Sequence, residues 1–576
     1  MEKDLFQPLP DCVSTLLVNV LVPNENGTYS RNDIALTDGI ISQIAQGNAL
    51  NPNTSEFEEV IDCSEKMILP GFVNAHTHSI EHWAKGLIKP LPLELWVLQL
   101  IRHEPRGERG WFGEKSFETT PAWAVGLSAL HAGLESILGG CTAILDHLFV
   151  RHLEDIEEAV KAYKALGIRA FIAPMLNDDA ELYANYIPLV HDAKQRNDKL
   201  KLNEQCISGC CSGISDGGMA EDGSFRLRKG KYDSQKTKDM LALWEEAIQK
   251  FHDPKGGIEI VIGPVTPYSC SPELLRGATE LRKRYNLCGH THLLETRAQA
   301  LLAKQFFPSG SAVKHLKEVG FLDSELRGTS FAHTIWLTQE EMDLVAENGG
   351  ICVHNPLSNL RLGSGVMPVE KAIKSNIKVA MGCDGSCSSD GQDMLEVLKM
   401  GTILTTTTNP DYKEWSTPSS FALNMASKNG YAAIGMDGDA GDIKVGMVAD
   451  LTLWDLTSLA LLPRTDPLSL LILGSRTQAP DAGSTLNTAW VRGYKIISNG
   501  SPLGVNVAAL RRSLMKAEPN YRNPEITDPR TDEKTAGAER EYRAAMGLDI
   551  ICQEVPTPDE LKSFPQNCVL YDSTIP

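Results

Sequence analysis

A chain of 576 residues with a formal net charge of −19 is not expected to bind nucleic acid or anionic membranes, because both are polyanions. Its 42% hydrophobic and 22% charged residues are typical of an ordinary globular protein. The first residues, MEKDLFQPLPDCVSTLL, lack a basic segment followed by an apolar core, and no apolar run is long enough to span a bilayer. We therefore expect a cytoplasmic protein whose partners are small molecules.

The first predicted elements are short strands. TLLVNVLVP and NDIALTDGIISQIAQ contain β-branched runs broken by Asn, Gly and Asp, which is the pattern of short strands and turns. We expect residues 12–66 to form the first part of a small β-sandwich.

From about residue 67 to residue 430, short apolar runs alternate with helical patterns. The eight runs are ILPGFVNAH (68–76), TAILDHL (142–148), RAFIAPM (169–175), IEIVIGP (258–264), NLCGHTHLL (286–294), TSFAHTI (329–335), GICVHNP (350–356) and KVAMGCDG (378–385). The helical patterns between them include residues 153–167, 271–285 and 338–349, and the first ends at a glycine, as a capped helix should. Strands that alternate with helices favour a parallel sheet, and eight repeats predict a closed (β/α)8 TIM barrel.

Residues 201–232 interrupt this alternation between the third and fourth strands. The segment is rich in Gly, Ser, Cys and charged residues. Its position predicts either a lid over the mouth of the barrel or a plain surface insertion.

After the barrel, alternating apolar and polar residues return in GDIKVGMVADLTLWDL and TAWVRGYKIISNG. We expect residues 431–503 to complete the β-sandwich begun by residues 12–66. The C-terminal tail, residues 504–576, has no predicted function.

Titratable residues stand where the chemistry of a TIM barrel occurs, at the C-terminal ends of the strands. The first strand ends in His76-Thr77-His78, the fifth in His292 with Glu295 just beyond, the sixth in His333, the seventh in His354-Asn355 and the eighth in Asp384. Residues i and i+2 of a strand point the same way, so His76 and His78 can both face the mouth.

The same parity applies to His290 and His292, but depth separates them. His290 is two residues, ~6–7 Å, further down the barrel, which favours a buried interior position. We therefore predict one site with four ligands: His76, His78, His292 and Asp384. Three imidazoles and a carboxylate suit one divalent metal ion, with zinc the default and iron the alternative. Buried core histidines without a metal are the structural alternative.

These motifs resemble those of the amidohydrolase superfamily, in its hydrolytic deaminase and chlorohydrolase branch. That branch includes guanine, cytosine and adenosine-type deaminases and triazine hydrolases. PGFVNAHTH resembles the family's first-strand motif, HTHLLET its His-x-x-Glu motif, and FAHTIWLT, HNPLSNLRLGSG and MGCDG its last three strands. GDIKVGMVADLTLWD resembles the segment that completes the flanking β-sandwich, so that the resemblance covers about residues 12–500.

The resemblance implies a role for each matched residue. His76, His78, His292 and Asp384 would hold the metal, Glu295 would be the general acid/base, and His333 would orient water or substrate. The end of the fourth strand, GPVTPYSCS, lacks the lysine of binuclear relatives, which favours one metal per chain. Val265 stands where many relatives carry a substrate-contacting histidine, which implies a less polar pocket on that side. The family also suggests a homodimer.

The predicted activity is hydrolytic deamination of an amino-substituted N-heterocycle by a metal-activated water, with Asp384 accepting the water's proton. Deamination of such a ring needs a group that protonates a ring nitrogen, and Glu295 can do this. The alternatives are hydrolysis of a lactam, an amide or an aryl chloride at the same mononuclear site, and a non-catalytic binding module.

Three residues near the predicted mouth have two interpretations each. Trp83 either binds substrate or packs. Asn359 either binds substrate or caps backbone groups in a turn. His147, at the end of the second strand, either reaches the pocket or is a buried, hydrogen-bonded histidine.

Overall fold

The computed structural model describes residues 4–24, 26–53, 55–100, 121–180, 218–219, 225–226, 231–408, 411–415, 421–474 and 485–521. The chain divides into two compact units. The first unit, Met1–Pro188 and Lys229–Pro529, contains the barrel, the flanking sheet and the candidate site. In the second unit, β9 (Gly218–Met219) and β10 (Phe225–Arg226) form a short antiparallel pair.

Two predictions concern segments that are largely undescribed. Most of the predicted lid, residues 201–232, lies outside the described residues, so its function stays a prediction. The tail is described only as far as α18 (Val507–Tyr521). No helix in the described ranges combines the length and apolarity needed to cross a membrane.

The barrel is built from eight parallel strand positions in chain order, as the alternating pattern predicted. Its strands are β6 (Phe72–Thr77), β7 (Cys141–Phe149), β8 (Arg169–Leu176), β11 (Ile258–Ile260) with β12 (Gly263–Pro264), β13 (Gly289–Leu293), β14 (Thr329–His333), β15 (Gly350–His354) and β16 (Lys378–Met381). The first four positions form one parallel sheet and the last four another.

Contacts at both junctions join these sheets into a closed barrel. A parallel bridge pairs Ile262 with Gly289, and the backbone N–H of Asp384 donates to the carbonyl of His76 at 2.8 Å. The fourth position is split because Ile262 donates its N–H to the carbonyl of Cys288, directly before β13, instead of to β8. The strands are almost wholly buried, as parallel strands covered by helices should be. The prediction of a (β/α)8 barrel is confirmed.

Helices follow the barrel strands and continue into the C-terminal part of the chain. They are α1 (Leu93–Leu100), α3 (Ala122–Leu138), α4 (Leu153–Leu166), α6 (Ser234–Phe251), α7 (Pro272–Tyr285), α8 (Arg297–Phe306), α9 (Ala312–Glu318), α10 (Gln339–Glu347), α11 (Pro356–Arg361), α12 (Val369–Lys374), α13 (Ser386–Ser389), α14 (Met394–Thr408), α15 (Leu423–Ala426), α16 (Lys428–Ala433), α17 (Pro467–Leu473) and α18. Short 3-10 turns are η1 (Ser79–Ala84), η2 (Tyr412–Glu414) and η4 (Leu459–Leu461).

Helix α4 shows how local sequence produces these elements. Asp155 in its first turn accepts hydrogen bonds from the backbone N–H groups of Arg151 and His152, which satisfies donors that a helix start leaves free. Ile156, Ala159, Val160 and Tyr163 form its buried face. Gly167 ends the helix in the left-handed conformation, with φ of 73°, where glycine pays no Cβ penalty.

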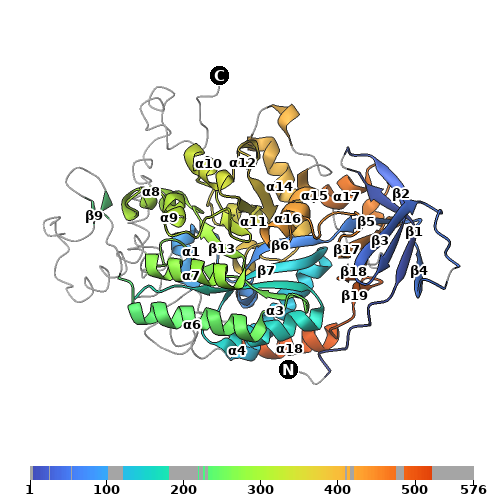
Figure 1. Ribbon diagram of the computed structural model, residues 1–576, viewed down its shortest axis with the longest axis horizontal. Helices are drawn as coiled ribbons and strands as arrows, with labels where there is room; N and C mark the ends of the chain where they lie inside the picture. The colour runs from blue at the N-terminus through green and yellow to red at the C-terminus, as the bar shows by residue number, and fades with distance from the viewer. Residues whose placement is uncertain are drawn as a thin grey trace. The chain divides into compact units, whose positions relative to one another are not determined.

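The strands from the two ends of the chain lie side by side in one sheet (Figure 1). Its members are β1 (Thr15–Pro23), β2 (Tyr29–Thr37), β3 (Ile40–Gln46), β4 (Glu59–Asp62), β5 (Lys66–Pro70), β17 (Leu451–Asp455), β18 (Leu486–Val491), β19 (Tyr494–Ser498) and β20 (Ser501–Pro502). The order is β20-β19-β18-β17-β5-β1-β2-β3, with β4 paired to β1. The seam is the antiparallel pair of β5 and β17, which buries Ile68 against Leu453. This mixed sheet joins the N- and C-terminal flanks, as the returning strand pattern predicted.

A buried ion pair ties the flanking sheet to the barrel. Arg169, the first residue of β8, donates from Nε and Nη2 to the carboxylate of Asp450 at 2.8 and 3.2 Å. The hydroxyl of Tyr431 donates to the same carboxylate at 3.0 Å. A buried carboxylate held in this way is costly to leave unpaired, so the contact fixes the sheet against the N-terminal end of the barrel.

Candidate metal centre and active site

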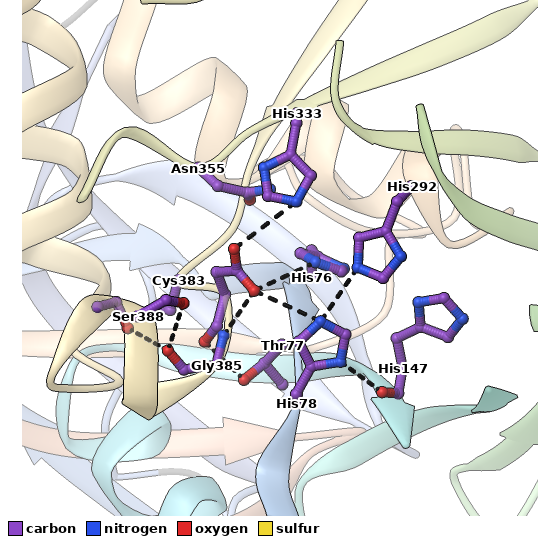
Figure 2. Close-up of polar contacts among 12 residues, drawn as sticks. His76, Thr77, His78, His147, His292, His333, Asn355, Cys383, Gly385 and Ser388 are labelled. Atoms are coloured by element: carbon purple, nitrogen blue, oxygen red, sulfur yellow. Dashed lines mark hydrogen bonds and ion pairs between the residues drawn. The ribbon is translucent and has the colours of Figure 1, made fainter. Parts of the chain in front are cut away.

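The carboxyl ends of three barrel strands, β6, β13 and β16, bring the four predicted ligands together. Nε2 of His76 and Nε2 of His78 lie 3.4 and 3.5 Å from Oδ1 of Asp384. Nε2 of His78 lies 3.1 Å from Nε2 of His292. All four side chains are buried, and Figure 2 shows the three rings turned toward the same space.

The hydrogen bonds of these rings leave their inner nitrogens free for a metal ion. Nδ1 of His78 donates to the carbonyl of His147 at 2.7 Å, and Nδ1 of His292 donates to the carbonyl of Val265 at 2.8 Å. A carbonyl only accepts, so each ring keeps its hydrogen on Nδ1 and presents the Nε2 lone pair inward. Two such lone pairs facing each other repel unless a cation lies between them. The residues therefore fit a bound metal ion.

His76 is oriented by a longer chain of contacts. Its Nε2 is buried without a hydrogen-bond partner among the described residues, and its Nδ1 lies 2.8 Å from Nε2 of His290. Nδ1 of His290 in turn lies 2.8 Å from Oγ of Ser330. If His76 presents its Nε2 lone pair inward, its Nδ1–H must donate to His290, and His290 must donate to Ser330. His290 is fully buried below the mouth, and it supports a predicted ligand there.

Glu295 and His333 lie beside the predicted ligands. Nε2 of His333 is 3.7 Å from Oε2 of Glu295 and 3.7 Å from Oδ2 of Asp384. Its Nδ1 donates to Oδ1 of Asn359 at 2.9 Å, which directs Nε2 toward the two carboxyl groups. The ring is thus fixed between the two carboxyl groups.

The two carboxyl groups have opposite pKa shifts. Burial, together with the negative charges of Asp384 and Glu94, raises the pKa of Glu295 well above its usual value. Burial alone would raise the pKa of Asp384 too, but the neighbouring rings of His76, His333 and His78 hold it well below its usual value. Two carboxyl groups whose pKa values are shifted in opposite directions can act as an acid and a base at the same pH.

Strained backbone marks the same strand ends. His333 and Asp384 have φ of 72° and 64°, and Leu294 and Thr334 have φ of 47° and 48°. Non-glycine residues in the left-handed region cost about 1–3 kcal/mol each and persist where the surroundings hold them. The strain turns the chain sharply where a side chain must face the mouth.

A comparison with known protein families shows which family the chain belongs to. Residues 67–491, most of the chain, match the amidohydrolase family. The chain belongs to the amidohydrolase family.

Relatives of this amidohydrolase include nucleoside deaminases. It is 27% identical over 499 residues to a 5-methylthioadenosine/S-adenosylhomocysteine deaminase of Pyrococcus furiosus, covering 86% of this chain and 98% of that protein. It is 26% identical over 505 residues to a 5'-deoxyadenosine deaminase of Methanosarcina barkeri, covering 88% of this chain and 96% of that protein.

Solved structures share the fold. An atrazine chlorohydrolase of Arthrobacter aurescens in complex with zinc matches with a TM-score of 0.69 and 21% identity, over 88% of this chain and 100% of that chain. An adenosine deaminase of Xanthomonas campestris with bound zinc matches with a TM-score of 0.67 and 21% identity, over 89% and 100%. At this identity the likeness concerns the fold alone.

The remaining predicted residues of the amidohydrolase site have identifiable contacts. Trp83 is partly buried and donates from Nε1 to the carbonyl of Ala124 in α3 at 3.0 Å. This hydrogen bond holds its indole ring against α3. Asn359 contacts His333 directly. His147 is fully buried, and its Nε2 donates to the carbonyl of Gly263 at 3.1 Å. Substrate binding by Trp83 and Asn359 stays a prediction.

Three residues near the site carried no recognised signal in the sequence. Gln392 donates to the carbonyl of Asp384 at 2.6 Å and accepts from Thr77 at 2.9 Å, so it supports two strand ends at once. Glu94 of α1 accepts from Oγ1 of Thr296 at 2.5 Å, beside Glu295. Glu81 is a buried carboxyl group three residues after His78, and this spacing, which repeats that of His292 and Glu295, could have identified it.

The chain of contacts behind His76 leads to a testable result. The His290→Phe variant keeps a ring of similar size but cannot accept the hydrogen of His76, so we expect metal affinity about 10–100-fold lower. Competition with a coloured chelator measures that affinity. His315→Phe, at a buried histidine stacked on Phe307 outside the barrel interior, is the matched control. Equal affinity in both variants would show that His290 does not support the ligand.

Proposed function

We propose that this amidohydrolase is a metal-dependent hydrolytic deaminase of adenine-type nucleosides or of a related amino-substituted N-heterocycle. The observation that carries the proposal is the pairing of a buried Glu295, with a raised pKa, and an ionised Asp384 on either side of His333. The names of the Pyrococcus and Methanosarcina relatives support the nucleoside class.

The metal of this proposal is a single ion held by His76, His78, His292 and Asp384, with zinc preferred and iron compatible with the ligand set. When bound, the ion would lower the pKa of a water molecule so that a nucleophile is present near neutral pH. The segment GPVTPYSCS offers no lysine for a second ion at the end of the fourth strand.

The protein's own residues would then move the protons. Asp384, held ionised by its histidine neighbours, accepts the proton of the attacking water. Glu295, held protonated by burial, donates to a ring nitrogen, which makes the attacked carbon more electrophilic. His333 holds the water or the developing oxygen between them. Return of a proton to the amino group from Asp384 or Glu295 lets ammonia leave.

An ammonia-release screen tests the proposed function. The panel contains adenosine, 5'-deoxyadenosine, 5-methylthioadenosine and S-adenosylhomocysteine, together with aminopyrimidines and aminotriazines. We expect ammonia from at least one member. The Val265→His variant tests the less polar side of the pocket, and we expect it to change the ranking of substrates. With a chlorinated aminotriazine and a lactam added to the panel, chloride release or ring opening without ammonia would instead identify the aryl chloride or lactam alternative. No product from any member would remove the proposal's support.

The homodimer and the cytoplasmic location suggested at the outset stay predictions.

A further inference from the structure

A second cluster of metal-ligand side chains lies outside the candidate active site. It consists of His82 in η1 and of His131 and Glu135, one turn apart on α3. Nε2 of His82 lies 3.5 Å from Oε2 of Glu135, and Nε2 of His131 lies 3.6 Å from Oε1 of Glu135. One ligand atom from each residue lies within 4.8 Å of the other two.

His82 is the best-fixed member of this cluster. Its ring is buried, its Nδ1 lies 2.6 Å from Oγ of Ser386, and its Nε2 has no hydrogen-bond partner within the described part of the chain. A buried ring nitrogen without a partner needs an explanation. The free nitrogen faces His131 and Glu135, whose side chains are about one-third exposed, so an ion can enter from solvent.

The protonation states near neutral pH are those that a metal requires. Burial lowers the pKa of His82, and burial together with the proximity of His82 lowers the pKa of His131 to about 3. Burial would raise the pKa of Glu135, but its contacts with His82 and Lys85 hold it well below its usual value. Two neutral imidazoles and one carboxylate therefore face a common space, and metal ligands must be deprotonated.

The side chain of Lys85 competes for this carboxylate. Its Nζ donates to both oxygens of Glu135, at 2.7 and 3.0 Å, and it is itself about one-third exposed. Exposed pairs of this kind are weak, and the long lysine side chain can turn into solvent. The ammonium group thus neutralises the carboxylate that a metal ion would bind, and the two cations would compete for it.

We propose that His82, His131 and Glu135 form a second, accessory site for a divalent transition-metal ion such as zinc, for which Lys85 is the internal competitor. Two imidazoles and a carboxylate, with one position open to water, form a ligand set that suits zinc. The accessory site shares no residue with His76, His78, His292 and Asp384, and it does not depend on the deaminase proposal.

Zinc titration of the full-length protein tests this site. Equilibrium dialysis against increasing zinc chloride, with elemental analysis, is expected to give a tight and a weaker class of binding, one ion each. His131→Ala and Glu135→Gln should remove the weaker class and leave the tight one. His292→Ala should do the reverse. The exposed His152→Ala is the matched control and should change neither.

For the Lys85→Gln variant we expect tighter zinc binding at the accessory site, whereas His131→Ala and Glu135→Gln should abolish it. Loss of the competing ammonium group should strengthen the weaker class by up to about fivefold, which a folding defect would not do. A single zinc per chain at saturation would overturn the accessory site. A second zinc that persists in both His131→Ala and Glu135→Gln, or that binds no more tightly in Lys85→Gln, would also overturn it. Two classes of zinc in a protein that releases no ammonia would contradict only the deaminase proposal.

Discussion

The Glu295→Gln variant is expected to retain its metal but to lose ~10²–10⁴-fold in kcat, which is the usual contribution of a general acid–base group. Glutamine keeps the size of the side chain but cannot give up a proton. Glu295 is buried, and burial with the charges of Asp384 and Glu94 raises its pKa. It is thus the group in the described site best suited to protonate a substrate ring.

Steady-state ammonia release on the best substrate of the panel measures this effect, and elemental analysis shows whether the metal stays. The matched control is Glu273→Gln, at an exposed carboxylate in the first turn of α7, which should leave kcat unchanged. Activity close to that of the unaltered protein would exclude Glu295 as the acid. Loss of the metal would instead give Glu295 a structural role.

The His292→Ala variant is expected to lose both the tightly bound metal and the activity. His292 supplies one of the three rings whose Nε2 atoms converge, and its Nδ1 is fixed by the carbonyl of Val265. Removal of a ligand should reduce activity by more than the ~10–100-fold expected for the loss of a supporting partner such as His290. The loss should not be recovered by adding zinc at concentrations that saturate the unaltered protein.

Elemental analysis of protein purified without added metal, then dialysed against a weak chelator, measures this loss. The unaltered protein should retain about one ion per chain at the active-site ligands, because the chelator removes the more weakly bound ion of the accessory site. His147→Phe is a useful comparison, because His147 contributes its backbone carbonyl to His78 and that carbonyl survives the substitution. A full metal content in His292→Ala would mean that the histidine cluster is not the metal centre.

The sequence by itself determined the architecture and the positions of the predicted ligands along the strands. Strands and helices that alternate eight times have few ways to bury their apolar faces, and a parallel barrel is the way that leaves no strand edge unpaired. The strand period of two then places His76 and His78 on one side, and the strand ends place His292, His333 and Asp384 at the same mouth. These inferences need only local periodicity and the rule that parallel strands end together.

Only the tertiary structure decided which side chains support the site. Strand parity places His290 and His292 on the same side and does not show which of them is a metal ligand. Only the closed barrel shows that Nε2 of His290 contacts Nδ1 of His76, 214 positions earlier in the chain. Gln392 under Asp384, Glu94 beside Thr296, and the cluster of His82, His131 and Glu135 likewise join separate elements. Such contacts depend on the relative register and the packing angles of distant elements, which the spacing of residues along a chain does not encode.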